Sequence, residues 1–234
     1  MTDIAANLAA VRSRIDAACR NSGREPGSVR LLPVSKTRPA SDVSKAYEAG
    51  ATRFGENRVQ EAYAKAEELA GTGVEWAIIG HLQVNKAKLV TRFAAEFQAL
   101  DSVKLAAELD KRLHAVGRQL DVLIEVNSSG EATKSGLPPE QVVGFAAQLA
   151  PFDALRVRGL MTIALPSDDP ALVAPCFETL RTLQARLRDQ AAPAQTYDEL
   201  SMGMSNDFEL AIAHGATTVR IGTAIFGPRN QPTG

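Results

Sequence analysis

Short apolar runs alternate with amphipathic segments along almost the whole chain, and this alternation limits the possible folds more than any other feature. The apolar runs predict strands near residues 30–36, 52–55, 75–80, 97–100, 120–126, 155–162, 198–201 and 217–222. Helical spacing predicts helices near 40–49, 57–70, 83–93, 102–116, 138–150, 170–190 and 206–214. Another amphipathic helix opens the chain and ends near residues 21–23, with an apolar face formed by Ile4, Leu8, Val11, Ile15 and Cys19.

Strict alternation of strands and helices predicts parallel strands joined by right-handed crossovers. Eight such units in about 200 residues favour a closed (β/α)8 barrel of the TIM type, an α/β fold, here with an extra N-terminal helix. An open doubly wound sheet is the alternative, because the predicted strands at 97–100 and 198–201 are short. No linker or change of composition divides the sequence, so we expect a single domain over residues 1–234. The functional site of such a barrel lies at the C-terminal ends of its strands.

The composition argues against several classes of partner. The chain has 26 Lys plus Arg and 27 Asp plus Glu, a net charge of -1, and no basic block, so neither nucleic acid nor an anionic membrane is expected. No apolar run approaches the ~20 residues that span a bilayer. The N-terminal residues lack the features of a secretory signal, and Cys19 and Cys176 belong to no CxxC pair. We therefore predict a cytoplasmic protein.

Lys36 ends the first predicted strand and is the first candidate for covalent chemistry. The period of two in a strand puts Leu32, Val34 and Lys36 on one face. Partial burial and the nearby charge of Arg38 would both favour the neutral amine that a Schiff-base lysine needs. From this segment alone, an ordinary lysine at the end of a strand is the alternative.

Glycine and small polar residues gather at other predicted strand ends, in segments 54–57, 79–83, 161–162, 201–205 and 220–223. Glycines let a ligand approach the backbone, and hydroxyl groups at helix starts suit a phosphate. The segment 201–205 precedes a predicted helix and is of this kind. Equally, Ser205 could be an ordinary helix N-cap and the glycines turn residues.

Arg220 is predicted to face the barrel interior. Val219 and Ile221 share the opposite face, toward the outer helices. An inward arginine must meet an acceptor or an acid, and two alternatives follow. It either forms an internal salt bridge, for example with Glu125, or binds the ring nitrogen or phosphate of a ligand.

Marks of nucleotide and metal sites are missing from the sequence. It has no Walker-type GxxxxGK[ST], GxGxxG or HExxH motif and no cysteine cluster. His81 follows a predicted strand and could line the site, but it has no visible partner as a metal ligand, while His114 and His214 lie in helical stretches. No metal is therefore expected.

Taken together, the strand-end motifs resemble the pyridoxal phosphate homeostasis proteins. The motifs occur in the order of that family and cover nearly the whole chain, at residues 34–37, 54–57, 59–61, 79–83, 85–86, 134–136, 159–161, 200–205 and 219–223. The resemblance implies a barrel like the N-terminal domain of alanine racemase, of PLP fold type III. It also implies that pyridoxal 5'-phosphate (PLP) is bound as an aldimine.

The resemblance extends to individual cofactor-binding residues. By similarity, Lys36 is the Schiff-base lysine and Arg220 the partner of the pyridine nitrogen. Asn57 and His81 resemble residues of the wall near the ring. By the same similarity, Ser201 and the backbone around Gly222 and Thr223 resemble the phosphate cup of the family.

Two functions are compatible with such a site. PLP stabilises carbanions best when its ring nitrogen is protonated, and an arginine there disfavours that protonation. Racemases of this fold also need a second base, a tyrosine delivered by an extra β-domain of a partner subunit, and no such domain is expected here. We therefore expect a PLP carrier or buffer in intracellular vitamin B6 homeostasis, without catalytic turnover, that is a monomer and supplies apo PLP-dependent enzymes. A small PLP-dependent amino-acid racemase is the alternative.

Two further residues have open roles. The polar loop 127–136 after the fifth predicted strand is interpreted as a lid, with Lys134 as a transient second amine or simply a solvated loop lysine. Glu56 could orient Lys36 or Asn57, or could be an acid at a helix N-terminus.

Overall fold

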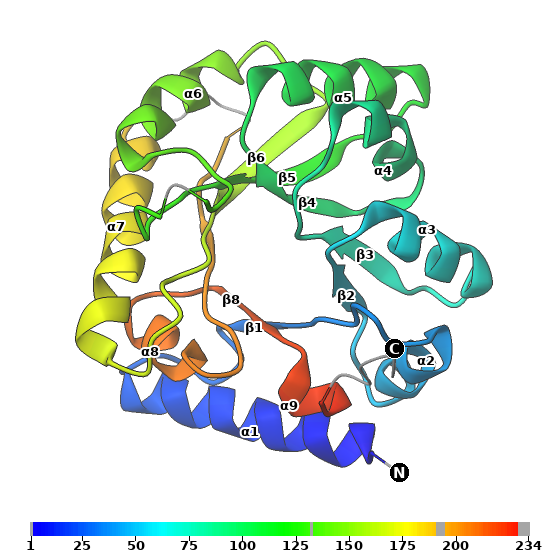
Figure 1. Cartoon of the computed structure of the whole chain (residues 1–234), viewed down its shortest axis with the longest axis vertical. Helices are drawn as coiled ribbons and strands as arrows, with labels where there is room; N and C mark the ends of the chain where they lie inside the picture. Colours follow the sequence, from blue (N-terminus) through cyan, green and yellow to red (C-terminus); the bar gives the residue numbers. More distant parts are fainter. Residues whose placement is uncertain (1, 132, 191–194, 229–234) are drawn as a thin grey trace.

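Eight parallel strands form a ring surrounded by helices in the computed structural model, which describes residues 2–131, 133–190 and 195–228 (Figure 1). The strands are β1 (Arg30–Pro33), β2 (Arg53–Glu56), β3 (Glu75–Ile78), β4 (Glu96–Leu100), β5 (Leu120–Glu125), β6 (Leu155–Met161), β7 (Glu199–Ser201) and β8 (Thr218–Ile221). The helices are α1 (Ile4–Asn21), α2 (Ala40–Glu48), α3 (Val59–Glu68), α4 (Ala87–Phe93), α5 (Val103–Ala115), α6 (Val142–Gln148), α7 (Pro170–Arg188), α8 (Phe208–Ala213) and α9 (Thr223–Phe226).

The strand order β1-β8-β7-β6-β5-β4-β3-β2 places the first and last members of the sheet beside each other. A parallel bridge between Val34 and Gly55 joins them, and the Ser35 N–H donates to the Gly55 carbonyl at 3.0 Å. The predicted barrel is therefore confirmed, and the open doubly wound sheet is excluded.

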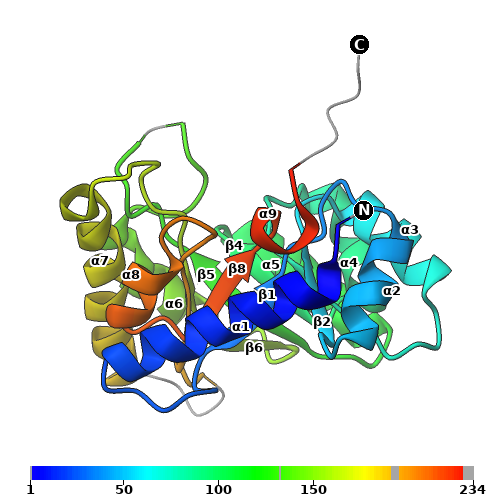
Figure 2. The same ribbon diagram turned by 90° about the horizontal axis from the view of Figure 1, so that it is seen from below.

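Helix α1 lies along the outside of the barrel beside α2, α8 and α9, as Figures 1 and 2 show from two directions. Asp3 caps it by accepting the Ala6 N–H at 2.9 Å, as a side-chain oxygen at an N-cap does. All the residues of its predicted apolar face are buried. The helix thus covers apolar surface that the crossover helices leave on this side.

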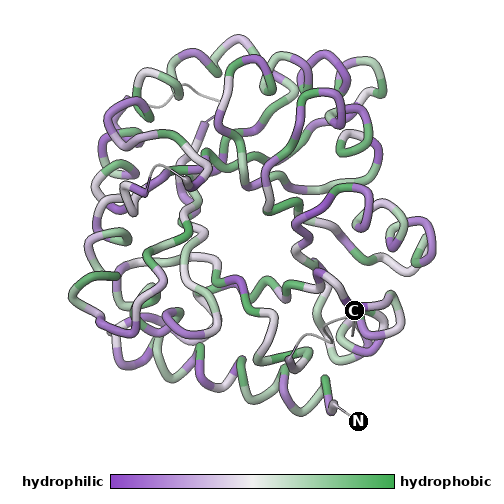
Figure 3. The backbone as a smooth tube through the Cα atoms, in the orientation of Figure 1, coloured by the Kyte–Doolittle hydropathy of each residue, from purple (hydrophilic) through white to green (hydrophobic). Residues whose placement is uncertain are grey.

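The hydrophobic core is divided by the strand ring. Most buried apolar residues lie between the strands and the helices, while a small cluster of Leu32, Val34, Ala77 and Ile79 fills part of the interior. Figure 3 shows hydrophilic segments recurring along the outer helices. No helix in the described residues is long and apolar enough to cross a membrane.

The observed elements depart from the predicted ones mainly at their ends. The first strand ends at Pro33 rather than at residue 36, although the Val34 N–H still donates to the Ile221 carbonyl at 2.9 Å. Two predicted helices begin with a separate 3-10 turn, at Val84–Lys86 and Pro139–Gln141. Helix α9 was not predicted, because a single turn is too short to show helical periodicity.

Candidate functional site

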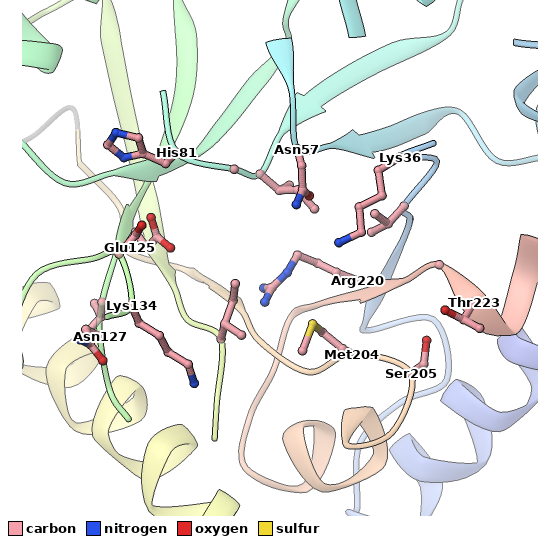
Figure 4. A pocket seen from close by; sticks show the side chains of 17 residues that line it. Lys36, Asn57, His81, Glu125, Asn127, Lys134, Met204, Ser205, Arg220 and Thr223 are labelled. Atoms are coloured by element: carbon pink, nitrogen blue, oxygen red, sulfur yellow. The ribbon is translucent and has the colours of Figure 1, made fainter. Parts of the chain in front are cut away.

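A cavity of about 340 Å³ opens at the C-terminal ends of the strands (Figure 4). Residues that follow or end β1, β2, β3, β5, β6, β7 and β8 line it. Of the predicted site residues it brings together Lys36, Asn57, His81, Arg220, Gly222 and Thr223. The barrel thus gathers residues that are far apart in the sequence.

Lys36 lines this cavity next to Val34. The predicted shared face is confirmed, since Leu32 and Val34 belong to the interior cluster and Lys36 continues in the same direction. In Figure 4 the Lys36 amine points toward the space above the Arg220 guanidinium. This placement favours the chemical interpretation of Lys36 over an ordinary lysine at a strand end.

Lys65, a buried lysine on α3, holds the backbone that precedes Lys36. Its Nζ donates to the Ser35 carbonyl at 2.8 Å, to Glu56 Oε1 at 2.6 Å and to Glu61 Oε1 at 2.8 Å. The Ser35 hydroxyl also donates to Glu56 Oε1, at 2.6 Å. Burial raises the pKa of Glu56, and the bonds from Lys65 and Ser35 oppose this rise.

The backbone that follows Lys36 is fixed by the same group of residues. Glu61 Oε1 accepts the Thr37 N–H at 2.6 Å, and Thr37 has a φ of +63°, a conformation that L-residues rarely adopt. Lys36 is therefore flanked by two anchored residues. Glu56 is fully buried at the end of β2, so its open role is resolved in favour of support for the Lys36 segment.

Arg220 lies at the floor of the cavity with its guanidinium held in one orientation. Nη1 donates to Ser201 Oγ at 2.8 Å and Nη2 to the Thr162 carbonyl at 2.7 Å. Burial lowers the pKa of Arg220 to about 10, against the opposing charges of Asp207 and Glu125. The predicted inward orientation of Arg220 is confirmed. Within the described chain Arg220 and Glu125 form no salt bridge, which was one of the two alternatives.

Ser201 is the one predicted site residue that lies outside the cavity wall. It is completely buried beneath Arg220, and its hydroxyl donates to Gln98 Oε1 at 2.7 Å. Gln98 in turn donates to Glu96, which pairs with Arg30 at 2.7 Å. The hydroxyl thus belongs to a polar chain inside the barrel, and the assignment of Ser201 to a phosphate cup stays a prediction.

The other expected members of the cup, Gly222 and Thr223, lie in the cavity wall. Ser205, Gly222 and Thr223 line the cavity, and α9 begins at Thr223. A Cβ on Gly222 would lie 3.0 Å from the Val34 carbonyl oxygen. Glycine therefore keeps this part of the wall open. Ser205 belongs to segment 201–205, which the sequence already indicates as a phosphate candidate; the N-cap residue of α8 is Asp207, not Ser205.

The far wall of the cavity contains residues that the sequence did not single out as binding residues. Glu125 is 6% exposed, and its Oε2 has no hydrogen-bond partner among the described residues. Burial first and the charge of Asp101 second raise the pKa of Glu125 to about 7, while Arg220 acts in the opposite direction. The sequence feature that could have identified Glu125 is an acid within the otherwise apolar run 122–126.

The remaining polar residues of this wall have partners at its edge. His81 Nδ1 lies 3.5 Å from Asp101 Oδ2, with 56% of its side chain exposed. Lys134 Nζ lies 2.5 Å from Glu131 Oε2 and donates to the Ala164 carbonyl at 3.1 Å. Lys134 is thus anchored rather than solvated, although it lines the cavity; residue 132 of this loop lies outside the described residues.

One group of side chains elsewhere in the described chain has the geometry to hold a metal ion. It consists of Asp110, His114 and Asp153. None of these residues lines the strand-end cavity, and the His114 side chain is exposed.

Comparisons with known proteins agree with the fold and show the family. Residues 6–230 match the family model of the alanine racemase N-terminal domain. The pyridoxal phosphate homeostasis protein of Haemophilus influenzae is 42% identical over 229 residues, covering 97% of this chain and 96% of that protein. The protein of the same name from Escherichia coli K12 is 43% identical over 233 residues, covering 98% of each.

A solved structure extends the comparison from sequence to fold. PipY of Synechococcus elongatus, determined with PLP bound, is 37% identical and has a TM-score of 0.84. The similarity covers 96% of this chain and all of that one.

Proposed function

This chain belongs to the alanine racemase N-terminal domain family and, within it, to the pyridoxal phosphate homeostasis proteins; on this premise we propose that it carries PLP on Lys36. In this role it would hold the reactive aldehyde, release it to apo PLP-dependent enzymes and so buffer intracellular vitamin B6. The observation that supports this most directly is the convergence of Lys36, Arg220 and Gly222 in one cavity.

The residues that line the cavity fit PLP. The cofactor supplies an aldehyde that reacts with a primary amine and a ring that withdraws electrons. Lys36 would form the covalent bond, and the open wall at Ser205, Gly222 and Thr223 would bind the phosphate through hydroxyl and backbone N–H groups. Arg220, oriented by Ser201 and Thr162, would face the ring nitrogen. We retain Asn57 and His81 as residues of the ring wall.

Gly222→Ala tests the phosphate wall. The added Cβ would press on the Val34 carbonyl 3.0 Å away and narrow the cavity. Overpacking of this size costs about 1–3 kcal/mol, so PLP should be retained roughly fivefold more weakly or worse, as measured by equilibrium dialysis. Gly144→Ala on α6 is the matched control, because a Cβ there meets nothing within 4 Å. Equal PLP retention in both variants would remove Gly222 from the proposed site.

The carrier function is preferred to the racemase because no tyrosine of the described chain lines the cavity, where it could act as the second base. Tyr47, Tyr63 and Tyr197 do not line it. Tyr197 is buried, its hydroxyl donates to Gln195 at 3.0 Å, and burial raises its pKa to about 12. The cationic Arg220 would also weaken the ring as an electron sink.

Proton exchange distinguishes the two functions. The PLP-loaded protein is incubated with a panel of amino acids in deuterated water, and loss of the α-proton is followed by NMR. We expect no more exchange than free PLP causes, together with transfer of PLP to an apo-enzyme. Rapid, stereospecific exchange would instead establish the racemase.

We also propose that residues 1–234 act as one domain and as a monomer, because the strand ring encloses its own core. Sedimentation of the PLP-loaded protein at several concentrations measures this. A mass of one chain throughout is the expected result.

A further inference from the structure

The cavity has two ends of different chemistry (Figure 4). Lys36 and Thr223 lie on one side, and Glu125 lies on the other, with its carboxylate directed into the space that Arg220 also faces. The proposed cofactor site uses the first side and Arg220. It leaves Glu125, a nearly completely buried acid, without a function.

Glu125 differs from the other buried glutamates of the described chain. Glu56 contacts the Lys65 ammonium at 2.6 Å, and Glu96 contacts the Arg30 guanidinium at 2.7 Å. Among the described residues Glu125 forms no ion pair, and its Oε2, like that of Glu56, has no hydrogen-bond partner. Because an unpaired buried carboxylate is costly, the usual structural role of a buried ion pair does not explain Glu125.

The neighbouring charges leave the Glu125 end open to a cation. Asp101, which follows β4, repels the Glu125 charge and is itself close to His81, which follows β3. Across the cavity, the charge of Arg220 on β8 attracts Glu125, but among the described residues the two side chains form no ion pair. A cation beside Glu125 would be attracted by the carboxylates of Glu125 and Asp101 and repelled by the guanidinium of Arg220.

The cations nearest to this end are engaged elsewhere. Lys134, in the loop after β5, lies 2.5 Å from Glu131 and bonds the Ala164 carbonyl. Lys36, after β1, lies on the opposite side and is assigned to the cofactor. The cavity wall also includes the exposed Ile163, whose side chain suits an apolar stem.

We propose that the Glu125 end of the cavity is a second subsite, which binds the ammonium group of a primary alkylamine next to the cofactor. The proposal rests on the proposed PLP site. The ammonium group donates hydrogen bonds to the Glu125 carboxylate, and the apolar stem packs on Ile163. A ligand with a carboxylate beside its amine binds more weakly, because that carboxylate would face Asp101 and Glu125, while Arg220 is assigned to the ring nitrogen and Lys134 pairs with Glu131.

Binding at this subsite depends on pH in a defined direction. The pKa of Glu125 is about 7 without the ligand, and the ammonium pairs with the ionised carboxylate. Affinity therefore rises with pH, by about tenfold between one pH unit below and one above that pKa. The ligand in turn lowers the pKa of Glu125.

The test uses PLP-loaded protein reduced with borohydride, in which the bond to Lys36 no longer exchanges with added amines. The side-chain carboxyl groups of glutamate are labelled with ¹³C, and Glu125→Gln identifies the Glu125 resonance. n-Butylamine is titrated in and compared with 1-butanol, its neutral counterpart, and with L-norvaline, which adds a carboxylate to the same stem.

We expect n-butylamine to lower the pKa of Glu125 by about one unit or more and to bind at least about tenfold more tightly than either comparison ligand. Weakened binding to Glu125→Gln supports the same conclusion. An unchanged pKa, or equal binding of 1-butanol, overturns the subsite. If loading of PLP alone already lowers the pKa of Glu125, the proposed subsite is also overturned, because Glu125 would then interact with PLP itself. If borohydride traps nothing on Lys36, it is the proposed PLP site that fails.

Discussion

Lys65→Met should lower the free energy of unfolding by about 3–5 kcal/mol, the cost of removing one partner from a buried ion pair. The Lys65 side chain is 8% exposed and its ammonium contacts Glu56 at 2.6 Å and Glu61 at 2.8 Å. Methionine fills much of the same space without the charge. Urea unfolding of the protein without cofactor measures the loss. Lys45→Met on α2 is the matched control, since that side chain is 55% exposed, and it should change stability by less than about 0.5 kcal/mol.

The same variant also tests the support of Lys36. Without Lys65 the Ser35 carbonyl loses its donor, and Glu61, which holds Thr37, loses its cation. We therefore expect slower trapping of PLP on Lys36 by borohydride, under conditions where the variant remains folded. If Lys65→Met is as stable as the parent and traps PLP at the same rate, this group of residues does not position Lys36.

Glu125→Gln should stabilise the protein without cofactor at alkaline pH by roughly 3 kcal/mol, because each unit of pKa shift corresponds to about 1.36 kcal/mol. The pKa of Glu125 is raised from 4.5 to about 7 in the folded state. Folding therefore binds a proton, and the parent loses stability as the pH rises from the unfolded value through the folded one. Glutamine has no proton to lose, so its advantage is absent below the unfolded pKa and complete above the folded one.

Urea unfolding of parent and variant across this pH range measures the difference. Glu68→Gln, at an exposed position on α3, is the matched control and should show no such change with pH. A constant difference between Glu125→Gln and the parent at all pH values would show that the carboxyl does not titrate as the geometry implies.

The barrel was predictable because its signals are local. Each strand and helix carries its own periodicity, and a period of two was enough to place Lys36 with Leu32 and Val34. The inward orientation of Arg220 followed from the same argument. In each of these cases the prediction needed only the residues of one strand.

Features that depend on contacts between distant segments could not be read in this way. Ser201 has the right residue type for a phosphate site, but its hydroxyl bonds Gln98 on β4 and Arg220 on β8, which are far from it in the sequence. Lys65 resembles a surface lysine on its helix and is buried only because α3 packs on the segment before Lys36. Whether Glu125 has an ion-pair partner depends on the side chains of the facing strands, and the residues of β5 alone do not show this.

The central claim is that Lys36 is the residue that holds PLP. The measurement that tests it most directly is the absorbance spectrum of the protein with added PLP, before and after borohydride, followed by mass spectrometry of the lysine-bearing peptides. We predict a reducible chromophore and a cofactor mass on the peptide with Lys36, both lost in Lys36→Ala. A protein that remains colourless, or a label on another lysine that persists in Lys36→Ala, would contradict the account.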